Sequence, residues 1–257
     1  MKRYYFLTIA ALVAASVAAY AQETGINSGK VIYTEKIKLE IKLEGDAAQM
    51  ANMLPTERTS EKVLLFGSEA TLFQDGVTPG DDMPQEEGGG VRIKMVVSGQ
   101  DKLFTDLKKK TFLDQKDFMN RIFLIESPIA EQGWKITGQQ KAILGYPCME
   151  AEKSDTAGKK TIAWFSPSIN VSSGPAGLCN LPGMILEADI DNGSRIYTAK
   201  SVESIPEADL KIQKPREGKK VTEAEFKTIV ADKMKEMGIE NGSAGNGGAQ
   251  VRIIIKK

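Results

Sequence analysis

A long alternation of apolar and polar side chains near the start of the chain constrains the fold most. From Gly29 to Leu43 the polar positions are mostly Thr, Lys and Glu. The apolar positions between them are Val31, Tyr33, Ile37, Leu39, Ile41 and Leu43. Side chains of a β-strand point alternately to opposite faces, so the pattern predicts a strand with one buried and one solvated face. A strand of this length is typical of a long curved antiparallel sheet rather than a small sandwich.

Turn residues divide much of the remaining chain into further β-type segments. Hairpins are expected around Gly67-Ser68, around residues 155–158 and around Asn192-Gly193, the strongest turn signal of the three. Additional strands are expected at 91–97, 102–107, 111–113, 121–125 and 251–255. Trp134–Ile136 is expected to pair with Ala142–Leu144. The chain is therefore predicted to be mainly β (β-rich α+β), with a half-barrel-like sheet.

One amphipathic helix is expected near the C-terminus. Thr222 and Glu225 have the spacing of a capping box, in which each side chain hydrogen-bonds to the backbone N–H of the other residue. Gly238 stands where a helix would stop. The apolar face of this helix should pack on the sheet, and it consists of Phe226, Ile229, Val230, Met234 and Met237.

The N-terminal residues have the pattern of a secretory signal peptide. Lys2 and Arg3 precede the apolar run 6–19, and Ala19-Tyr20-Ala21 fits the cleavage pattern, so residues 1–21 are expected to be removed between Ala21 and Gln22. No Cys follows to carry a lipid anchor, and no later segment is apolar enough to cross a membrane. The exported chain would be a single β-rich domain over residues 22–238, followed by a Gly-rich linker and terminal strand over 239–257. Its expected location is the periplasm or the extracellular, outer-membrane surface.

Composition argues against several classes of function. Basic and acidic residues are equal at 34 each, which gives no clustered basic footprint for a nucleic acid. The chain has no His, which excludes Ser-His-Asp and Cys-His catalysis and any His-ligated metal. No catalytic, cofactor-binding or metal-binding set stands out, so we expect a protein that is not an enzyme and holds no cofactor.

The only cysteines are Cys148 and Cys179. An even number of cysteines in an exported chain favours a disulfide, here between the segment before Glu150 and the loop that follows Gly174. The alternative is a pair of buried free thiols.

A Gly/Pro-rich loop leads directly into a buried-looking strand. Gly174-Pro175 and then Leu181-Pro182-Gly183 specify two backbone turns, and the strand 184–191 follows. Three segments that precede this loop belong to the same set of motifs and occur in a fixed order: Trp134-Lys135-Ile136, residues 143–151 and residues 163–167. This ordered set resembles the GLPGLI family, secreted proteins of Bacteroidota whose function is unknown, over about residues 30–237.

The GLPGLI resemblance implies a secreted β-rich protein and supplies no catalytic residues. The chain departs from the family signature at Asn180, where the signature has its first Gly, and at Met184, where it has its second Leu. Because Pro182 and Gly183 are retained, the fold is expected to survive both departures.

Three functions remain open. The first is a non-enzymatic protein that binds a hydrophobic ligand or lipid on the concave face of its sheet, which requires an unfilled apolar cavity. The second is a cell-envelope interaction or assembly factor with a filled core and no small ligand. The third is a hydrolase using carboxylates, which requires carboxylates that converge with raised pKa values. Separately, Asp155-Thr156-Ala157 looks like a short O-glycosylation acceptor.

Overall fold

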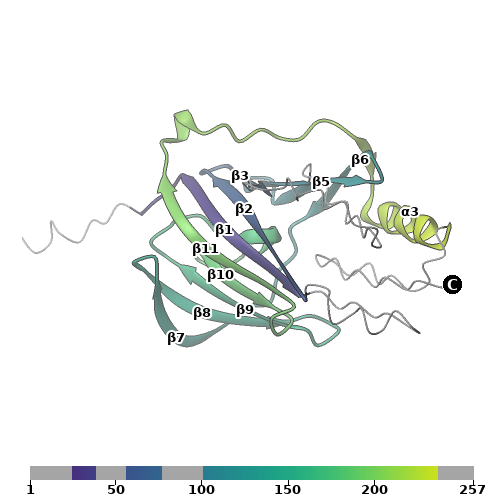
Figure 1. Cartoon of the computed structure of the whole chain (residues 1–257). Helices are drawn as coiled ribbons and strands as arrows, with labels where there is room; N and C mark the ends of the chain where they lie inside the picture. Colours follow the sequence, from purple (N-terminus) through teal and green to yellow (C-terminus); the bar gives the residue numbers. More distant parts are fainter. Residues whose placement is uncertain (1–24, 39–55, 77–100, 237–257) are drawn as a thin grey trace, which may run out of the picture.

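The fold is one open β-sheet of twelve strands, seen in a computed structural model that describes residues 25–38, 56–76 and 101–236 (Figure 1). The strands are β1 (Gly29–Lys38), β2 (Glu57–Phe66), β3 (Ala70–Asp75), β4 (Lys102–Asp106), β5 (Thr111–Phe118), β6 (Arg121–Pro128), β7 (Lys135–Ile143), β8 (Tyr146–Ser154), β9 (Lys160–Ser166), β10 (Met184–Ile190), β11 (Arg195–Ser204) and β12 (Lys219–Val221). The remaining elements are the short 3-10 turns η2 (Pro175–Gly177) and η3 (Glu207–Asp209) and the helix α3 (Glu223–Glu236). The mainly β prediction is confirmed.

Two antiparallel meanders make up the sheet. Its strand order is β12-β6-β5-β4-β3-β2-β1-β11-β10-β9-β8-β7. The first wing, β1–β6, and the second wing, β7–β11, join where β1 pairs with β11. Every ladder is antiparallel except the short parallel pairing of β12 with β6. The edges of the sheet are therefore β7 and β12.

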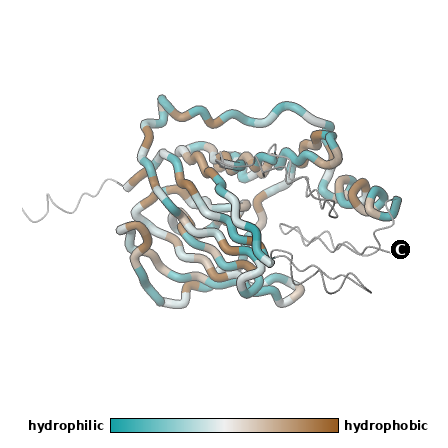
Figure 2. Tube along the Cα trace, in the orientation of Figure 1, coloured by the Kyte–Doolittle hydropathy of each residue, from teal (hydrophilic) through white to brown (hydrophobic). Residues whose placement is uncertain are grey.

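The sheet curves around residues 173–183, the later part of the connection from β9 to β10, which we call the motif loop (Figure 1). At the end of this loop, the Tyr33 hydroxyl of β1 donates a hydrogen bond to the Ile185 carbonyl oxygen over 2.6 Å. Within the loop, Gly177 lies against the side chains of Leu103 and Phe112 on β4 and β5. The loop therefore occupies the concave face, where Leu178 and Leu181 belong to the main buried core. Figure 2 shows the alternation of apolar and polar residues along the strands that form this face.

A smaller apolar cluster lies on the convex face of the first wing. Leu72, Phe104, Leu113 and Leu124 are buried together, and Ile212 packs against them. Ile212 belongs to residues 205–218, which run from β11 across the sheet to β12 (Figure 1). This long connection therefore covers apolar surface that the first wing would otherwise expose to water.

The C-terminal helix begins as the sequence predicts. The Thr222 amide donates to the Glu225 carboxylate at 2.7 Å, and the Glu225 amide donates to the Thr222 hydroxyl at 3.2 Å. Phe226 packs edge-on against Phe118 and Phe123, at ring-centroid distances of 6.2 and 5.3 Å. The helix therefore docks on the end of the β5–β6 hairpin, yet none of its residues is fully buried.

One predicted pairing is wrong, and several predictions lie outside the described residues. Trp134–Ile136 does not pair with Ala142–Leu144, because Lys135–Ile143 forms one strand that pairs with β8 and carries an irregularity between Ile136 and Gln140. The signal peptide and its cleavage site, the strand 91–97 and the segment 239–257 fall outside the described residues, so they stay predictions. Within the described residues no helix is long and apolar enough to cross a membrane.

Candidate functional site: a charged band on the concave face

A buried carboxylate interrupts the apolar face of β1. Glu35 stands in phase with Val31 and Tyr33, pointing to the concave face, and is only 4% exposed. Charged residues are almost never this buried unless they are paired, because transfer of a charge from water to a protein interior is costly. Glu35 therefore requires partners from the neighbouring strands.

Strands β11 and β2 supply these partners. The Tyr197 hydroxyl donates to Glu35 Oε1 at 2.7 Å, and the Ser60 hydroxyl donates to Oε2 at 2.9 Å. Lys62 Nζ lies 3.5 Å from Oε2, and Arg195 Nε lies 3.6 Å from Oε1. Both residues directly opposite Glu35 in its two ladders, Ser60 and Tyr197, thus contribute a hydroxyl.

These contacts decide the ionisation state of Glu35. Burial is the largest single influence and favours the neutral acid, but Lys62, the Tyr197 hydroxyl, Arg195 and the Ser60 hydroxyl together lower its pKa below the ordinary value. Burial also raises the pKa of Tyr197 far above its usual range, so this phenol stays a hydrogen-bond donor. The cluster is therefore an ionised carboxylate held by neutral hydroxyls and nearby cations at neutral pH.

Charged side chains continue from Glu35 across the first wing. Lys62 also pairs with Asp75 on β3, and Asp114 pairs with Lys116 on β5 at 3.2 Å. The pKa of Asp101, immediately before β4, is raised first by burial and then by the nearby charges of Asp114 and Asp75. We call this set the charged band, which consists of Arg195, Glu35, Lys62, Asp75, Asp101, Asp114 and Lys116.

The acidic end of the band differs electrostatically from its centre. Desolvation by the surrounding protein raises the pKa of Asp114 and of Asp101, with Lys116 opposing the shift in both cases. The third functional class required carboxylates of this kind, so these residues meet its geometric condition in part. Among the described residues no group of Cys, Asp and Glu side chains is arranged to hold a metal ion.

An aromatic side chain forms the floor between the band and the core. The Phe73 ring packs edge-on against Tyr33 at 6.5 Å and against Tyr197 at 6.0 Å, measured between ring centroids. Phe73 and Asp75 lie on the same face of β3 because they are two positions apart. The charged groups thus lie above packed aromatic rings.

The motif loop is a structural element beside this band rather than an exposed contact surface. Gly174, Pro175, Leu181 and Gly183 are buried, whereas Asn180 and Pro182 are exposed. Gly174 allows close approach to Ile185, since an added Cβ would lie 2.7 Å from the Cβ of that residue. The loop therefore serves to fill the concave face.

Both departures from the GLPGLI signature have a structural explanation. Asn180 has φ +67°, a left-handed conformation that Asn tolerates better than other non-Gly residues, and its side chain donates to the Ala130 carbonyl oxygen at 2.9 Å. Met184 is fully buried in the core, where it fills the volume that Leu would occupy. Each substitution keeps the conformation or burial that its position requires.

The predicted disulfide is contradicted, because Cys148 and Cys179 are both buried free thiols. Cys148 lies opposite Lys141 in the β7–β8 ladder. The Cys179 sulfur accepts a hydrogen bond from Gln132, which itself accepts one from Lys153 of β8. Positions 148 and 153 are an odd number of residues apart, so their side chains project from opposite faces of β8. The strand itself therefore separates the two thiols.

The free thiols give a direct test. Burial raises the pKa of Cys179 to about 11 and also raises that of Cys148, so both should react slowly in the folded protein. In denaturant without reductant, a thiol reagent is expected to titrate both cysteines, with reaction at least about tenfold faster than in buffer. An intact mass lower by two hydrogens would contradict the free-thiol structure and restore the disulfide prediction.

The sequence contains a signal for Glu35 as well. Glu35 is an even number of positions from Val31, Tyr33 and Ile37, so its side chain lies on the strand face that the sequence predicts to be buried. A charged residue on a predicted buried face is unusual. The rest of the band has no comparable signal, because Asp75, Asp101 and Asp114 come together only through strand pairing.

The candidate O-glycosylation tripeptide at Asp155-Thr156-Ala157 lies in the exposed β8–β9 turn. In this turn the Asp155 carboxylate accepts a hydrogen bond from the Ala157 amide at 2.8 Å.

These features define a class of protein, a β-rich domain built on one curved open sheet whose concave face is filled by its own loop. A family model described as "Protein of unknown function (Porph_ging)" matches residues 152–187, which run from the end of β8 through the motif loop into β10. The match covers a minor part of the chain, so it supports a likeness to proteins of unknown function, while the GLPGLI resemblance stays a prediction. No curated protein matches the chain.

Solved structures of a larger protein share the fold. The chain is similar to PNGF-II in its P21 crystal form, with 17% identity, a TM-score of 0.55, and coverage of 80% of this chain and 33% of that one. The C2 form gives 16% identity, a TM-score of 0.54, and coverage of 79% and 32%. The chain thus spans about a third of PNGF-II. At this identity the likeness shows the fold alone.

Proposed function

We propose that this chain is an exported binding domain that holds a polar ligand at the charged band of its concave face. The observation that carries the proposal is the network around Glu35, which is 4% exposed and contacts Tyr197, Ser60, Lys62 and Arg195. Buried ionic groups are a weak source of stability compared with apolar residues of similar size. Their presence on an otherwise apolar face therefore favours a role in recognition.

The chemistry of the band suits a ligand that both donates and accepts hydrogen bonds. Lys62, Arg195 and Lys116 offer cationic donors, whereas Asp75, Asp101 and Asp114 offer anionic acceptors. The outer members remain accessible, since the Asp114 and Lys116 side chains are 30% and 37% exposed. A ligand rich in hydroxyl or amide groups could therefore satisfy both kinds of partner at this end of the band.

A hydrophobic ligand or lipid finds less support on this face. Ala151, Ala163 and Ala188 form a row across the second wing, and each is completely buried in the same core as Leu178 and Leu181 of the motif loop. The loop thus fills the space in which an acyl chain would lie against the long strands. This packing is why we favour a polar ligand over the lipid-carrier hypothesis.

The test is native mass spectrometry of residues 22–257 purified from a periplasm, with solvent extraction of any bound molecule. A polar small molecule should co-purify with the parent and be lost, by at least about tenfold in occupancy, from the double variant Asp114→Asn/Lys116→Met. This variant removes one partly exposed ion pair without changing the net charge. The double variant Glu69→Gln/Lys108→Met removes a more exposed pair outside the band, with 62% and 66% exposed side chains, and should keep the ligand.

Two other outcomes would contradict the polar-ligand proposal. A lipid in the solvent extract would restore the carrier hypothesis. A protein that is empty in every preparation would favour the second candidate, an envelope interaction factor without a small ligand. That candidate is supported by the edge strand β7, on which Ile136 is 54% exposed and neighbouring positions are also open to solvent.

A further inference from the structure

The opposite edge of the sheet ends in an incompletely covered strand. β12 is only three residues long and pairs in parallel with Phe123–Ile125 of β6. Within the described residues no strand pairs with its other side. An edge strand presents unpaired N–H and C=O groups, which natural proteins cover with another segment or protect with charges.

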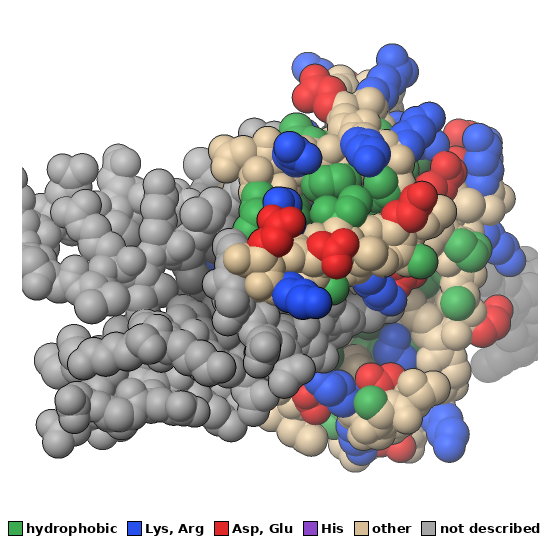
Figure 3. Space-filling view, turned by 90° about the vertical axis from the view of Figure 1, so that its right-hand side faces the viewer, with side chains coloured by type: hydrophobic (Ala, Val, Ile, Leu, Met, Phe, Trp, Pro, Cys, Tyr) green, Lys and Arg blue, Asp and Glu red, His purple; other side chains and the backbone are tan. Residues whose placement is uncertain are grey.

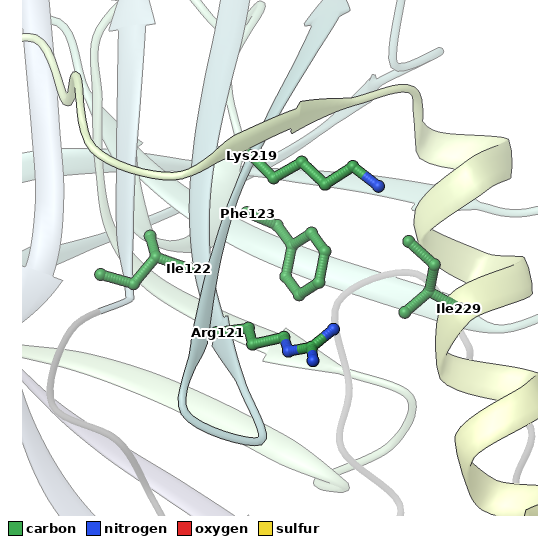
Figure 4. A pocket seen from close by; sticks show the side chains of 5 residues that line it. All are labelled: Arg121, Ile122, Phe123, Lys219 and Ile229. Carbon is green, nitrogen blue, oxygen red and sulfur yellow. The ribbon is translucent and has the colours of Figure 1, made fainter.

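A cavity lies beside β12 on each face of the sheet. The cavity on the helix side measures about 400 Å³ and is lined by Arg121, Ile122, Phe123, Lys219 and Ile229. In Figure 4 the Phe123 ring and Ile229 face each other across it, whereas Ile122 points away. The second cavity, of about 300 Å³, is lined by Leu113, Leu124, Glu126, Lys220, Val221, Thr222 and Glu225. Phe123 and Leu124 are adjacent in β6, so the cavities lie on opposite faces.

The apolar face of α3, which lies beside this edge, is also only partly buried. Phe226, Ile229, Val230 and Met234 form its apolar face, yet each is only partly buried. Figure 3 views the molecule from the side on which α3 lies and shows hydrophobic side chains surrounded by Lys, Arg, Asp and Glu. An apolar helix face of this kind normally packs against a core. A segment lying along β12 would extend the cover of both the helix and the strand.

We infer that the chain's own C-terminal residues 251–255 bind as an additional strand along the free edge of β12. Their sequence is Val-Arg-Ile-Ile-Ile, in which Val251, Ile253 and Ile255 share one strand face. That face suits the helix-side cavity, with Phe123 and Ile229. On the other face, Arg252 would approach the cavity lined by Glu126, Glu225 and Lys220, where two carboxylates face one cation. The apolar contacts on one face and the charged contacts on the other are thus satisfied by the same orientation of the added strand.

Chain length allows this binding within one molecule. The helix ends at Glu236, about 10 Å along its axis from Ile229 at the cavity. Residues 237–250 connect it to Val251 and can extend by roughly 45 Å. This connection is rich in Gly, Ser and Asn. The connection is therefore long enough for residues 251–255 to reach β12. This inference is independent of the ligand proposed for the charged band.

Amide hydrogen exchange of residues 22–257 tests the inference. Peptides covering Lys219–Val221 and residues 251–255 should exchange at least about tenfold more slowly in the parent than in the variant Ile253→Pro, because Pro removes the N–H and cannot continue a ladder. The control Ala244→Pro places the same residue in the connection and should behave as the parent. Peptides from β1 and β11 should be equally protected in all three proteins, which confirms that the sheet is folded.

Two results would overturn the inference. Equal exchange of Lys219–Val221 in the parent and in Ile253→Pro would show that the tail does not cover β12. Protection that is lost on dilution, together with a dimer mass in light scattering, would assign the strand to a second copy of the chain rather than to the same molecule.

Discussion

Replacing Gly183 by Ala is expected to destabilise the folded protein by more than about 3 kcal/mol. Gly183 has φ +147°, a conformation that residues with a side chain rarely adopt. An added Cβ would lie 2.6 Å from the Ser166 carbonyl carbon and closer still to its oxygen. Backbone atoms cannot move aside as a flexible side chain can, so β9 and the motif loop would have to separate. Urea unfolding at neutral pH measures the loss.

The control is the same substitution where space is open. Gly138 has φ +85°, and no atom lies within 4 Å of the position of an added Cβ. Gly138→Ala should therefore cost only the backbone strain, about 1–2 kcal/mol. Equal losses for the two variants would mean that close packing of the motif loop against β9 does not contribute to stability, contrary to the structure.

Replacing Glu35 by Ala should cost about 3–5 kcal/mol, because it leaves nearby cations and hydroxyls without their shared acceptor. Tyr197→Phe removes the donor of the 2.7 Å hydrogen bond while keeping the ring. In a double-mutant cycle, Glu35→Ala and Tyr197→Phe should show a coupling energy of about 0.5–3 kcal/mol. Additive losses would indicate that the two side chains do not interact. Thermal or urea unfolding of all four proteins provides the measurement.

The effect of Glu35 should depend on pH in a defined direction. Its pKa is lower in the folded state than in the unfolded state, so its stabilising contribution is complete above the ordinary Glu value of about 4.3. The contribution is lost as the pH falls through the lower, folded-state pKa. The stability gap between the parent and Glu35→Gln should therefore narrow as the pH falls below about 4.3. A gap that widens under acid would contradict the ionised network.

A surface ion pair supplies the control for the stability measurements on the Glu35 variants. Glu203 pairs with Lys30 at 2.7 Å, but its side chain is 57% exposed. Glu203→Gln should change the free energy of unfolding by less than about 1 kcal/mol, since water and salt screen such pairs. A loss as large as that of Glu35→Ala would show that burial is not what distinguishes the charged band.

Local sequence features were sufficient to predict many individual elements. The hairpin at Asn192-Gly193 forms as expected, because both residues adopt positive φ, at +51° and +83°. The capping box at Thr222 and Glu225 also forms as expected. Both features depend on interactions between residues close together in the chain, and such interactions can be read from a few consecutive letters.

The candidate site and the state of the cysteines depended on longer-range geometry. The pattern of β1 marks Glu35 as unusual, but Tyr197 becomes its partner only through the β1–β11 ladder that joins the two wings. Counting cysteines could not show that Cys148 and Cys179 are both buried free thiols. Pairing across a sheet brings together residues far apart in sequence, and the register decides which of their side chains meet.

The sequence by itself determined the mainly β class, the capped C-terminal helix and the positions of several turns, because alternation, capping and turn formation are local properties of the chain. Only the tertiary structure decided that the motif loop fills the concave face, that a charged band crosses the first wing and that both thiols stay free. These features arise where the two meanders curve toward each other around residues 173–183. Their geometry is set by packing among distant segments, which no local pattern in the sequence encodes.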